Sequence, residues 1–284
     1  MSNKINEDLF KTNAVRVAPE QTPFWYTSGR LGPFYINTHF IVKDEENAVR
    51  LLKNIESYIA EDKLTAPKKI FDDMLAMYET SDTFRNCIDE LVNTAKEFKF
   101  DYISGGERRD FFFSMLPAYI LKVPHLTIYK DMSAVYTSFD MTEPVEAGSA
   151  DLNGMKALHI ADLITEASSY ERAWIPVIRG LGSDITDTIA VVDRHQNGRA
   201  VLEGLGVNMV TLTGINRELF EEAQDKGVIN AQQKELVMSF LDSPEKYMDD
   251  FLKAHPDFIT GQIELGGKAK ERAELAISKG FAKI

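Results

Sequence analysis

The spacing of hydrophobic and polar residues changes several times along the chain, and each change predicts a different kind of element. Residues 1–43 interleave aromatic residues with glycine and proline, which is typical of short strands and turns rather than helices. From 44 to about 60 apolar residues recur at helical spacing. The same spacing predicts two further helices at 67–78 and 81–98.

Beyond residue 98, short apolar runs alternate with helical stretches. Strands are predicted at 102–103, 125–129, 157–161, 188–192 and 208–212, and helices at 111–121, 169–180 and 198–205. Strands separated by helices predict a parallel sheet wound with right-handed crossovers. From residue 216 onward the pattern predicts only helices, including 231–241, 244–254 and 268–279.

Residues 131–153 form the one long stretch without a clear period. It carries Pro144, Gly148 and several small or acidic residues. Since it is too long for an ordinary connection, a mobile lid is expected here.

The segment 156–170 holds the most informative pattern. Leu158 and Ile160 fit the interior of a buried strand, and Asp162 is predicted to stand where that strand ends. Ser168 and Glu171 then have the spacing of a capping box, which predicts that a helix begins just beyond the acid.

This layout favours an anion next to a sugar. The N-terminus of a helix offers unpaired N–H groups and a partial positive charge, while Thr165, Ser168 and Ser169 can add hydroxyl donors. Asp162 would then accept hydrogen bonds from ribose hydroxyls, at the carboxyl end of a strand where open α/β sheets bind ligands. A strand, loop and capped helix that bind nothing would show the same pattern, so both interpretations stand.

Charge and cysteine content narrow the class of protein. With 32 basic and 44 acidic residues the chain has a formal charge of −12, which disfavours nucleic acid and anionic membranes as partners. Cys87 is the only cysteine, so an internal disulfide is impossible and a reducing compartment fits. Because no apolar run approaches the length of a membrane span and the first residues lack an apolar signal core, we expect a cytoplasmic protein.

Four motifs follow one another along the chain. They are Ser28-Gly29-Arg30 with Phe34-Tyr35-Ile36-Asn37 behind it, Gly105-Gly106 in an expected turn, the segment 156–170, and Asp193-Arg194 after a later strand. Their order and spacing over residues 20–215 resemble the orotate phosphoribosyltransferases.

The resemblance implies the type I phosphoribosyltransferase fold, an α/β fold with a central parallel sheet flanked by helices. It also implies a small N-terminal hood at 1–43, a core at 44–215 with a helical insertion at about 64–98, and a helical C-terminal extension at 216–284. The implied reaction transfers 5-phosphoribosyl from phosphoribosyl pyrophosphate to orotate, with Mg²⁺ bound through the substrate and without direct protein ligands. A homodimer is expected on the same basis.

The resemblance also assigns roles to individual residues. Asp162 and Lys130 are the implied catalytic residues. Phosphoribosyl pyrophosphate would be held by Asp162, Thr165, Glu166, Ala167, Ser168, Ser169, Gly105, Gly106, Arg108, Arg109 and Lys130. Orotate would be held by Ser28, Arg30, Tyr35, Ile36 and Arg194. The alternatives are that the Arg108-Arg109 pair is a solvated charge run at a helix start and that Tyr35 is a core residue.

Three departures from the family pattern keep a second function open. Ala161 stands where the family has a further acid, Glu166-Ala167 replaces part of a glycine-containing turn, and 131–153 contains no Lys, Arg or His. A protein of the same fold that binds phosphoribosyl pyrophosphate or a nucleotide without turnover, or that transfers to another base, is therefore the alternative. His39, His125, His159 and His195 show no metal-ligand spacing and are expected to be core or surface residues.

Overall fold

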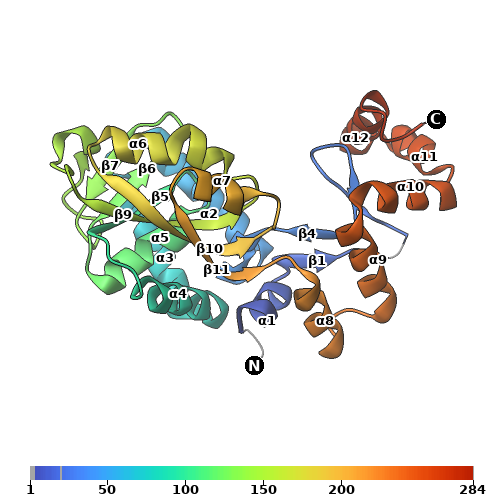
Figure 1. Cartoon of the computed structure of the whole chain (residues 1–284), viewed down its shortest axis with the longest axis horizontal. Helices are drawn as coiled ribbons and strands as arrows, with labels where there is room; N and C mark the ends of the chain where they lie inside the picture. Colours follow the sequence, from blue (N-terminus) through green and yellow to red (C-terminus); the bar gives the residue numbers. More distant parts are fainter. Residues whose placement is uncertain (1–3, 20, 284) are drawn as a thin grey trace. The chain divides into compact units, whose positions relative to one another are not determined.

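The computed structural model describes residues 4–19 and 21–283 and divides the chain into two compact units. The first unit comprises Met1–Ala14 and Asn37–Ile215, and the second comprises Val15–Ile36 and Asn216–Ile284. Each unit is therefore built from two separate stretches of sequence, which Figure 1 colours along the chain.

A seven-stranded sheet forms the centre of the first unit, in the order β11-β10-β9-β5-β6-β7-β8. The strands are β5 (Tyr102–Gly106), β6 (His125–Ile128), β7 (Ala134–Thr137), β8 (Val145–Glu146), β9 (Lys156–Ile164), β10 (Asp184–Asp193) and β11 (Asn208–Gly214). The five strands β5, β6, β9, β10 and β11 pair in parallel, and β7 and β8 add an antiparallel edge. The predicted α/β fold with a parallel sheet is confirmed.

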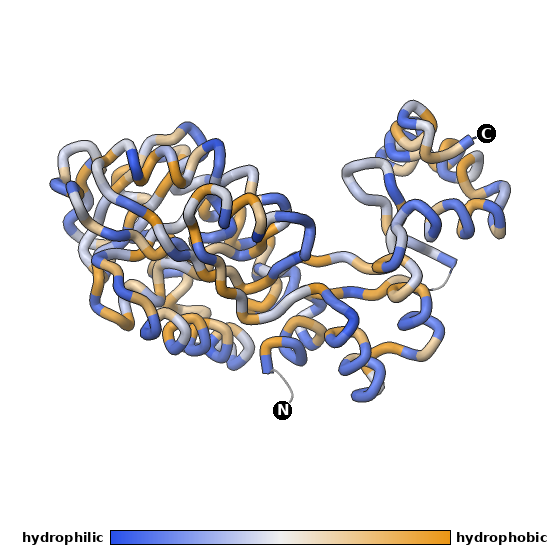
Figure 2. The backbone as a smooth tube through the Cα atoms, in the orientation of Figure 1, coloured by the Kyte–Doolittle hydropathy of each residue, from blue (hydrophilic) through white to orange (hydrophobic). Residues whose placement is uncertain are grey.

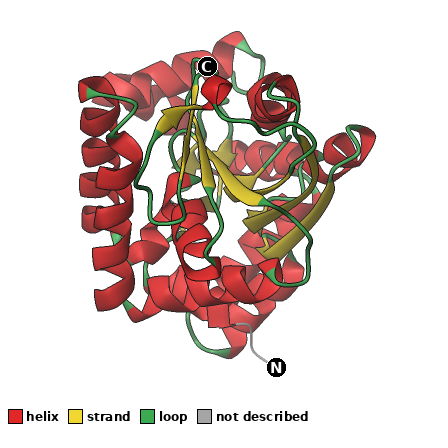
Figure 3. Ribbon diagram, turned by 90° about the vertical axis from the view of Figure 1, so that its left-hand side faces the viewer, coloured by secondary structure: helices red, strands yellow, loops and turns green. Residues whose placement is uncertain are grey.

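Helices cover both faces of this sheet, as Figures 1 and 3 show. The helices of the first unit are α1 (Lys4–Lys11), α2 (Glu45–Glu61), α3 (Ala66–Thr80), α4 (Asp82–Ala95), α5 (Phe111–Leu121), α6 (Ile175–Gly180) and α7 (Gly198–Gly204). Short 3-10 helices lie at η1 (Thr38–Val42) and η2 (Ala147–Ser149), and a π-helical turn, η3 (Tyr170–Trp174), leads into α6. The predicted helices at 44–60, 67–78, 111–121 and 198–205 are confirmed to within two residues.

Helix α5 shows why its sequence forms a buried element. Its residues are apolar on every side, and Phe111, Phe112 and Phe113 are all fully buried. A helix that is hydrophobic all round must be enclosed, and α5 is enclosed because it packs against β5 and β9 on one side and α3 and α4 on the other. Figure 2 shows the mixed hydropathy of the outer helices.

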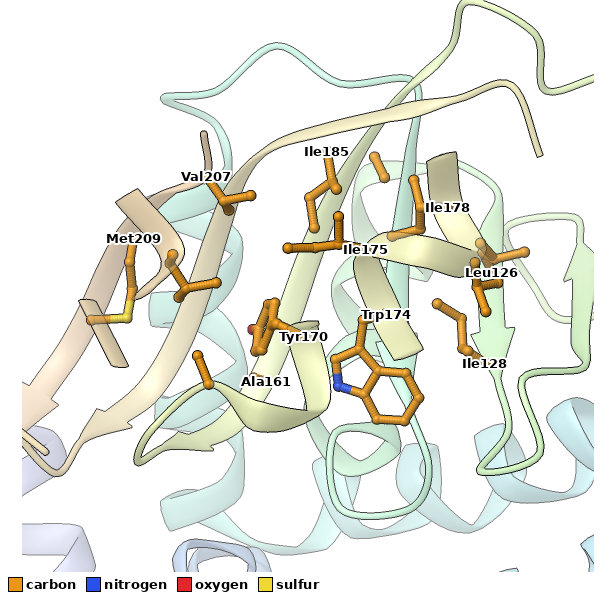
Figure 4. Close-up of a cluster of buried hydrophobic side chains, with 14 of the residues drawn as sticks. Leu126, Ile128, Ala161, Tyr170, Trp174, Ile175, Ile178, Ile185, Val207 and Met209 are labelled. Atoms are coloured by element: carbon orange, nitrogen blue, oxygen red, sulfur yellow. The ribbon is translucent and has the colours of Figure 1, made fainter. Parts of the chain in front are cut away.

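The opposite side of the sheet carries a large apolar cluster (Figure 4). Ile175 and Ile178 of α6 lie over Ile185 of β10, and Trp174 of η3 lies beside Leu126 and Ile128 of β6. Ala161 of β9 belongs to this cluster and is 2% exposed. The position where the resemblance expects a second acid is therefore an apolar contact in this chain.

The prediction of a mobile lid at 131–153 is wrong. The segment forms β7, β8 and η2 at the edge of the sheet, and Val135, Met141 and Leu152 are buried. The isolated apolar residues that gave no clear period are the residues that attach this edge to the core.

The second unit combines short strands with helices. Strand β1 (Val15–Val17) pairs with β4 (Phe34–Ile36), and β2 (Phe24–Trp25) pairs with β3 (Leu31–Gly32). The helices are α8 (Arg217–Asp225), α9 (Ala231–Asp242), α10 (Pro244–Ala254), α11 (Phe258–Leu265) and α12 (Gly267–Ser278). The predictions of strands before residue 43 and of helices after 216 are confirmed, whereas α1 and η1 contradict the prediction that 1–43 lacks helix.

Aromatic side chains join the strands of the second unit to its helices. Phe34 of β4 contacts Phe220 of α8 and Phe240 of α9, and Trp25 contacts Phe258.

None of the helices in the described part of the chain is long and apolar enough to cross a membrane.

Candidate active site

The site lies where the order of the parallel strands reverses. The chain passes from β5 outward to β6 and then returns to β9 on the other side of β5. In sheets of this kind, ligands bind in the crevice beyond the carboxyl ends of the two strands at the reversal. A ligand is therefore expected in the space between the ends of β5 and β9.

These two strands separate before they end. β5 pairs with β9 only over Tyr102–Ser104, although β5 stays paired with β6 as far as Gly106 and β9 stays paired with β10 as far as Ile164. Beyond this point the backbone groups of β5 and β9 no longer pair with each other. The separation also opens a cavity of about 340 Å³.

The cavity is lined by three segments of the first unit: the turn after β5, the residue after Tyr129, and the end of β9 with the turn into η3. Its lining residues are Glu107, Arg108, Arg109, Asp110, Lys130, Ala161, Asp162, Leu163, Ile164, Thr165, Glu166, Ala167, Ser168, Ser169, Tyr170 and Trp174. Most of the residues expected to bind phosphoribosyl pyrophosphate are thus brought together.

Asp110 connects the two separated strands. Its Oδ1 accepts a hydrogen bond from the N–H of Asp162 at 3.0 Å, and its Oδ2 accepts one from the N–H of Gly106 at 3.2 Å. One carboxylate thereby satisfies one N–H group on each side of the gap. Since unpaired buried N–H groups are costly, Asp110 stabilises the open arrangement of β5 and β9.

Asp162 lies on the inner wall of the cavity and is 8% exposed. Its Oδ2 is buried and has no hydrogen-bond partner among the described residues. Burial, and secondarily the neighbouring carboxyl of Asp110, raise the pKa of Asp162, while the charge of Arg109 opposes the shift. The site therefore contains a buried carboxyl whose charge is only partly compensated within the protein.

Two arginines bring positive charge to the same cavity. Arg108 forms an ion pair with Glu56 of α2, so the helices that precede the sheet fix one of these cations. Burial, and secondarily the charge of Arg109, lower the pKa of His39. The charge of Arg109 also acts on Asp162. The peptide bond between Glu107 and Arg108 is cis.

The turn from Thr165 to Ser169 forms another wall. The structure shows no acceptor for the backbone N–H groups of 166–169 among the described residues, and the side chain of Glu166 is exposed. Ala167 has a φ of +55°, a left-handed conformation that glycine adopts without the strain that a Cβ causes. Free N–H groups around a small polar concavity are suited to a phosphate group.

Local details of three predictions are wrong. β9 continues to Ile164, so Asp162 lies within the strand rather than at its end. Ser168 and Glu171 form no capping box, because the N–H of Glu171 donates to the carbonyl of Ala167 and a π-helical turn follows. Gly105 and Gly106 belong to β5 rather than to a turn.

The two glycines are required by packing. A Cβ on Gly105 would lie 2.1 Å from Ser114 Oγ, and one on Gly106 would lie 2.2 Å from the Trp174 ring. Gly198 permits a similar approach, because its N–H donates to the Thr165 carbonyl at 3.0 Å and a Cβ there would meet the same oxygen at 2.7 Å. Glycines thus bring α5, η3 and α7 close to the strand ends that shape the cavity.

Lys130 and Arg194 occupy the margins of the site. Lys130 lines the cavity, its N–H donates to Glu107 Oε2, and its side chain is largely exposed. Arg194 follows β10, and its N–H donates to the Ile164 carbonyl at 2.9 Å, which places it at the same edge of the sheet. It is not among the residues that line the cavity. Asp193, beside it, accepts from the N–H of His195.

With this geometry established, the chain was compared with known proteins. No family model matches it. It is 30% identical over 157 residues to an adenine phosphoribosyltransferase from Mesorhizobium japonicum, a match that covers 52% of this chain and 86% of the relative. The chain belongs to the phosphoribosyltransferase family. A similar match to an adenine phosphoribosyltransferase from Agrobacterium fabrum, 31% identical, covers 51% of this chain and 86% of that relative.

Solved structures agree on the fold of this phosphoribosyltransferase. The UMP synthase of Leishmania donovani superposes with a TM-score of 0.58 at 18% identity, over 85% of this chain but only 42% of that one. The orotate phosphoribosyltransferase of Francisella tularensis gives a TM-score of 0.50 at 13% identity, over 82% of this chain and 95% of that one. The expected type I phosphoribosyltransferase fold and enzyme class are confirmed.

The residues expected to bind orotate lie mostly in the second unit of this phosphoribosyltransferase. Arg30 forms an ion pair with Glu245 at 2.9 Å and stacks over Phe281 at 4.3 Å. Tyr35 and Ile36 pair with β1, while the Ser28 carbonyl accepts from Lys279 Nζ. These residues therefore already have partners within their own unit.

Two buried residues of the site were not predicted. Asp110 was not among the expected site residues, and His159 was expected to be a core or surface residue. His159 Nδ1 shares a hydrogen bond with Ser104 Oγ at 2.9 Å, and its Nε2 lies 3.5 Å from Asp110 Oδ2. An acid at the start of α5 and a histidine inside an apolar strand were the available signals, but only the sheet order brings them together.

The raised pKa of Asp162 predicts how stability depends on pH. An acid whose pKa is higher in the folded chain stabilises the fold fully below its unfolded pKa, and that contribution is lost as pH rises through the folded value, here about 8. We expect Asp162→Asn, which preserves the neutral form, to gain free energy of unfolding relative to the wild type between about pH 5 and about pH 8. Urea denaturation across this range measures the difference. The exposed variant Asp249→Asn is the control, and a pH-independent difference for Asp162→Asn would contradict the assignment.

The left-handed backbone of Ala167 predicts that its replacement by glycine does not lower stability. A left-handed alanine costs about 1–2 kcal/mol, whereas the buried methyl group contributes about 0.8 kcal/mol, so Ala167→Gly is expected to be neutral or stabilising. Ala157→Gly, in the regular strand β9, is the matched buried control and should lose about 1 kcal/mol or more. Thermal denaturation compares the two variants. Equal losses at both positions would show that residue 167 is not left-handed in solution.

Proposed function

We propose that this chain transfers the 5-phosphoribosyl group of phosphoribosyl pyrophosphate to orotate, giving orotidine 5′-phosphate and pyrophosphate. The observation that carries the proposal is the cavity between β5 and β9, which combines a buried carboxyl, two arginines and a turn with free N–H groups. These are separate partners for a ribose, a pyrophosphate and a monophosphate.

In this proposal the Asp162 carboxyl, which lines the cavity, binds the ribose hydroxyls. The turn from Thr165 to Ser169 holds the 5′-phosphate with its N–H groups and hydroxyls. Arg108 and Arg109 face the pyrophosphate, with Lys130 at the exposed rim. Each ligand group thus meets a protein group of complementary charge or hydrogen-bonding character.

The chemistry needs positioning and charge neutralisation more than proton transfer. Cleavage at the ribose C1 passes through an oxocarbenium-like state while pyrophosphate departs with its negative charge. Fixed cations beside the leaving group and a carboxyl beside the ribose stabilise this state more than the ground state. The pairing of Arg108 with Glu56 limits how far that cation must reorganise.

Magnesium enters this proposal as part of the substrate. Among the described residues no group of three or more His, Cys, Asp or Glu side chains is arranged to hold a metal. Mg²⁺ prefers phosphate oxygens and retains waters, so the complex of Mg²⁺ with phosphoribosyl pyrophosphate requires few protein ligands.

Two features support orotate as the acceptor. Ser28-Gly29-Arg30 with Phe34-Tyr35-Ile36-Asn37, and Asp193-Arg194, are the motifs that resemble the orotate enzymes. The likeness to the UMP synthase spans 85% of the chain, beyond the half that aligns with the adenine enzymes. Arg194 lies at the sheet edge next to the site, where its planar guanidinium could pair with a carboxylate. A homodimer is proposed on the same resemblance.

Adenine is the second candidate acceptor, because the relatives in sequence are named for it. An absorbance assay with Mg²⁺ and phosphoribosyl pyrophosphate, run with orotate or adenine in parallel, separates the candidates. We expect consumption of orotate. Consumption of adenine alone would favour the second candidate, and binding of phosphoribosyl pyrophosphate without turnover of either base would favour the non-catalytic alternative.

The two pocket arginines should differ in importance. Arg109 lies within electrostatic reach of Asp162, whereas Arg108 is already neutralised in part by Glu56. Arg109→Ala is therefore expected to lower kcat/KM for phosphoribosyl pyrophosphate on the order of 100-fold, as for other lost transition-state contacts, and Arg108→Ala by less. Steady-state kinetics with Arg85→Ala, a surface variant on α4, as control measures this. Wild-type kinetics for Arg109→Ala would contradict the placement of pyrophosphate.

A further inference from the structure

The carboxyl groups of Asp110 and Asp162 meet on the wall of the cavity, although they come from different elements. Asp110 immediately precedes α5, whereas Asp162 lies in β9. Both side chains are buried, and the Asp110 carboxyl acts on Asp162 both through its charge and as a hydrogen-bonding neighbour. Two neighbouring carboxyl groups in a buried site do not both ionise readily.

The hydrogen bonds distinguish the two acids. Both oxygens of Asp110 accept backbone N–H donors, from Gly106 and Asp162, and Oδ2 also lies 3.5 Å from Nε2 of His159. Donors around a carboxyl favour its charged form. Asp162 has one backbone donor, the N–H of Leu163, and its Oδ2 is buried without a partner among the described residues. We therefore place the proton of the pair on Asp162.

Several other ionisable groups face this pair and set its electrostatic surroundings. They are Glu107, Arg108 and Arg109 from the turn after β5, Lys130 after β6, His159 from β9, Glu166 from the following turn and Tyr170 from η3. Arg109 is the group among them whose charge opposes protonation of Asp162. Tyr170 donates to or accepts from Thr188 Oγ1 at 2.7 Å and is itself neutral, because burial and the charge of Asp110 raise its pKa.

We propose that Asp162 is neutral in the free protein because it is buried beside Asp110, a positioning residue, and that Asp162 releases its proton when the ribose of phosphoribosyl pyrophosphate binds. The O–H bond of Asp162 breaks, the proton passes to the solvent buffer, and the ribose hydroxyls donate to the carboxylate that results. No bond of the ligand changes in this step. The inference rests on the proposed function, since it takes phosphoribosyl pyrophosphate as the ligand of this cavity.

This arrangement gives the buried acid two states with different uses. Without ligand, the neutral form avoids a second uncompensated charge in a buried site. With ligand, the charged form is the better acceptor for hydroxyl donors and faces the oxocarbenium-like ribose. Asp110 thus acts on the ligand through Asp162, by holding its backbone and by disfavouring its charge.

Isothermal titration calorimetry with phosphoribosyl pyrophosphate and Mg²⁺ tests the proposal directly. Titrations at about pH 7.5, in buffers of different ionisation enthalpy, give the number of protons released on binding. Because the second pKa of a phosphate group is about 6, the phosphate groups of the ligand are already ionised at about pH 7.5. The wild type is expected to release up to about one proton per bound ligand, and the release should fall as pH rises through the raised pKa of Asp162.

Variants separate the role of Asp110 from a purely structural one. Asp162→Asn should release no proton. Asp110→Asn should release clearly less than the wild type, because Asp162 loses the charge that keeps it neutral, while Asp249→Asn should match the wild type. Circular dichroism establishes that each variant is folded, and the pH series of the wild type tests the proposal without any variant.

The outcomes distinguish this inference from the function on which it rests. The inference is supported if the wild type releases protons on binding and both Asp162→Asn and Asp110→Asn reduce that release. Binding of phosphoribosyl pyrophosphate with no proton release by the wild type overturns the inference and leaves the proposed function intact. An absence of binding overturns both.

Discussion

The structure of the site depends on one carboxylate that spans the gap between two strands. β5 and β9 part after three paired residues, and Asp110 accepts one N–H group from each strand at the point where they separate. Without these two hydrogen bonds the crevice would expose buried donors with no partner, which a folded protein avoids. The same carboxylate stands beside Asp162, so the group that stabilises the opening also adds to the effect of burial in raising the pKa of the acid within it.

An acidic protein can bind a polyanion only if the local field differs from the overall charge of −12. Here Arg108, Arg109 and Lys130 gather at the carboxyl ends of β5 and β6, and the turn after β9 adds N–H groups without acceptors. The helices before the sheet contribute to this arrangement, since Glu56 of α2 anchors Arg108. Ala161, where a further acid was expected, lies in the apolar cluster. The second carboxyl of the site comes instead from Asp110, at the start of α5.

Much of this architecture could be predicted because hydrophobic period reports burial directly. The alternation of strands and helices from 102 to 212 predicted the parallel sheet, and the helix predicted at 111–121 is α5. The cluster of Asp162, Thr165 and Ser168 with Arg108 and Arg109 followed from motif order. Asp110 and His159 could not be found in this way, because their proximity depends on strand order and on where β5 and β9 part. The segment 131–153 was misread since an irregular sheet edge lacks a regular period, although its buried Met141 and Leu152 hold it in place.

The central claim, that the gap between β5 and β9 is a phosphoribosyl site, is tested most directly by a crystal structure of the protein with phosphoribosyl pyrophosphate and Mg²⁺. The account predicts the 5′-phosphate against the turn from Thr165 to Ser169, the ribose hydroxyls on Asp162 with Asp110 still bridging the strands, and the pyrophosphate facing Arg108 and Arg109. A ligand bound elsewhere in the molecule, or one that reverses the positions of the two phosphate ends, would contradict it.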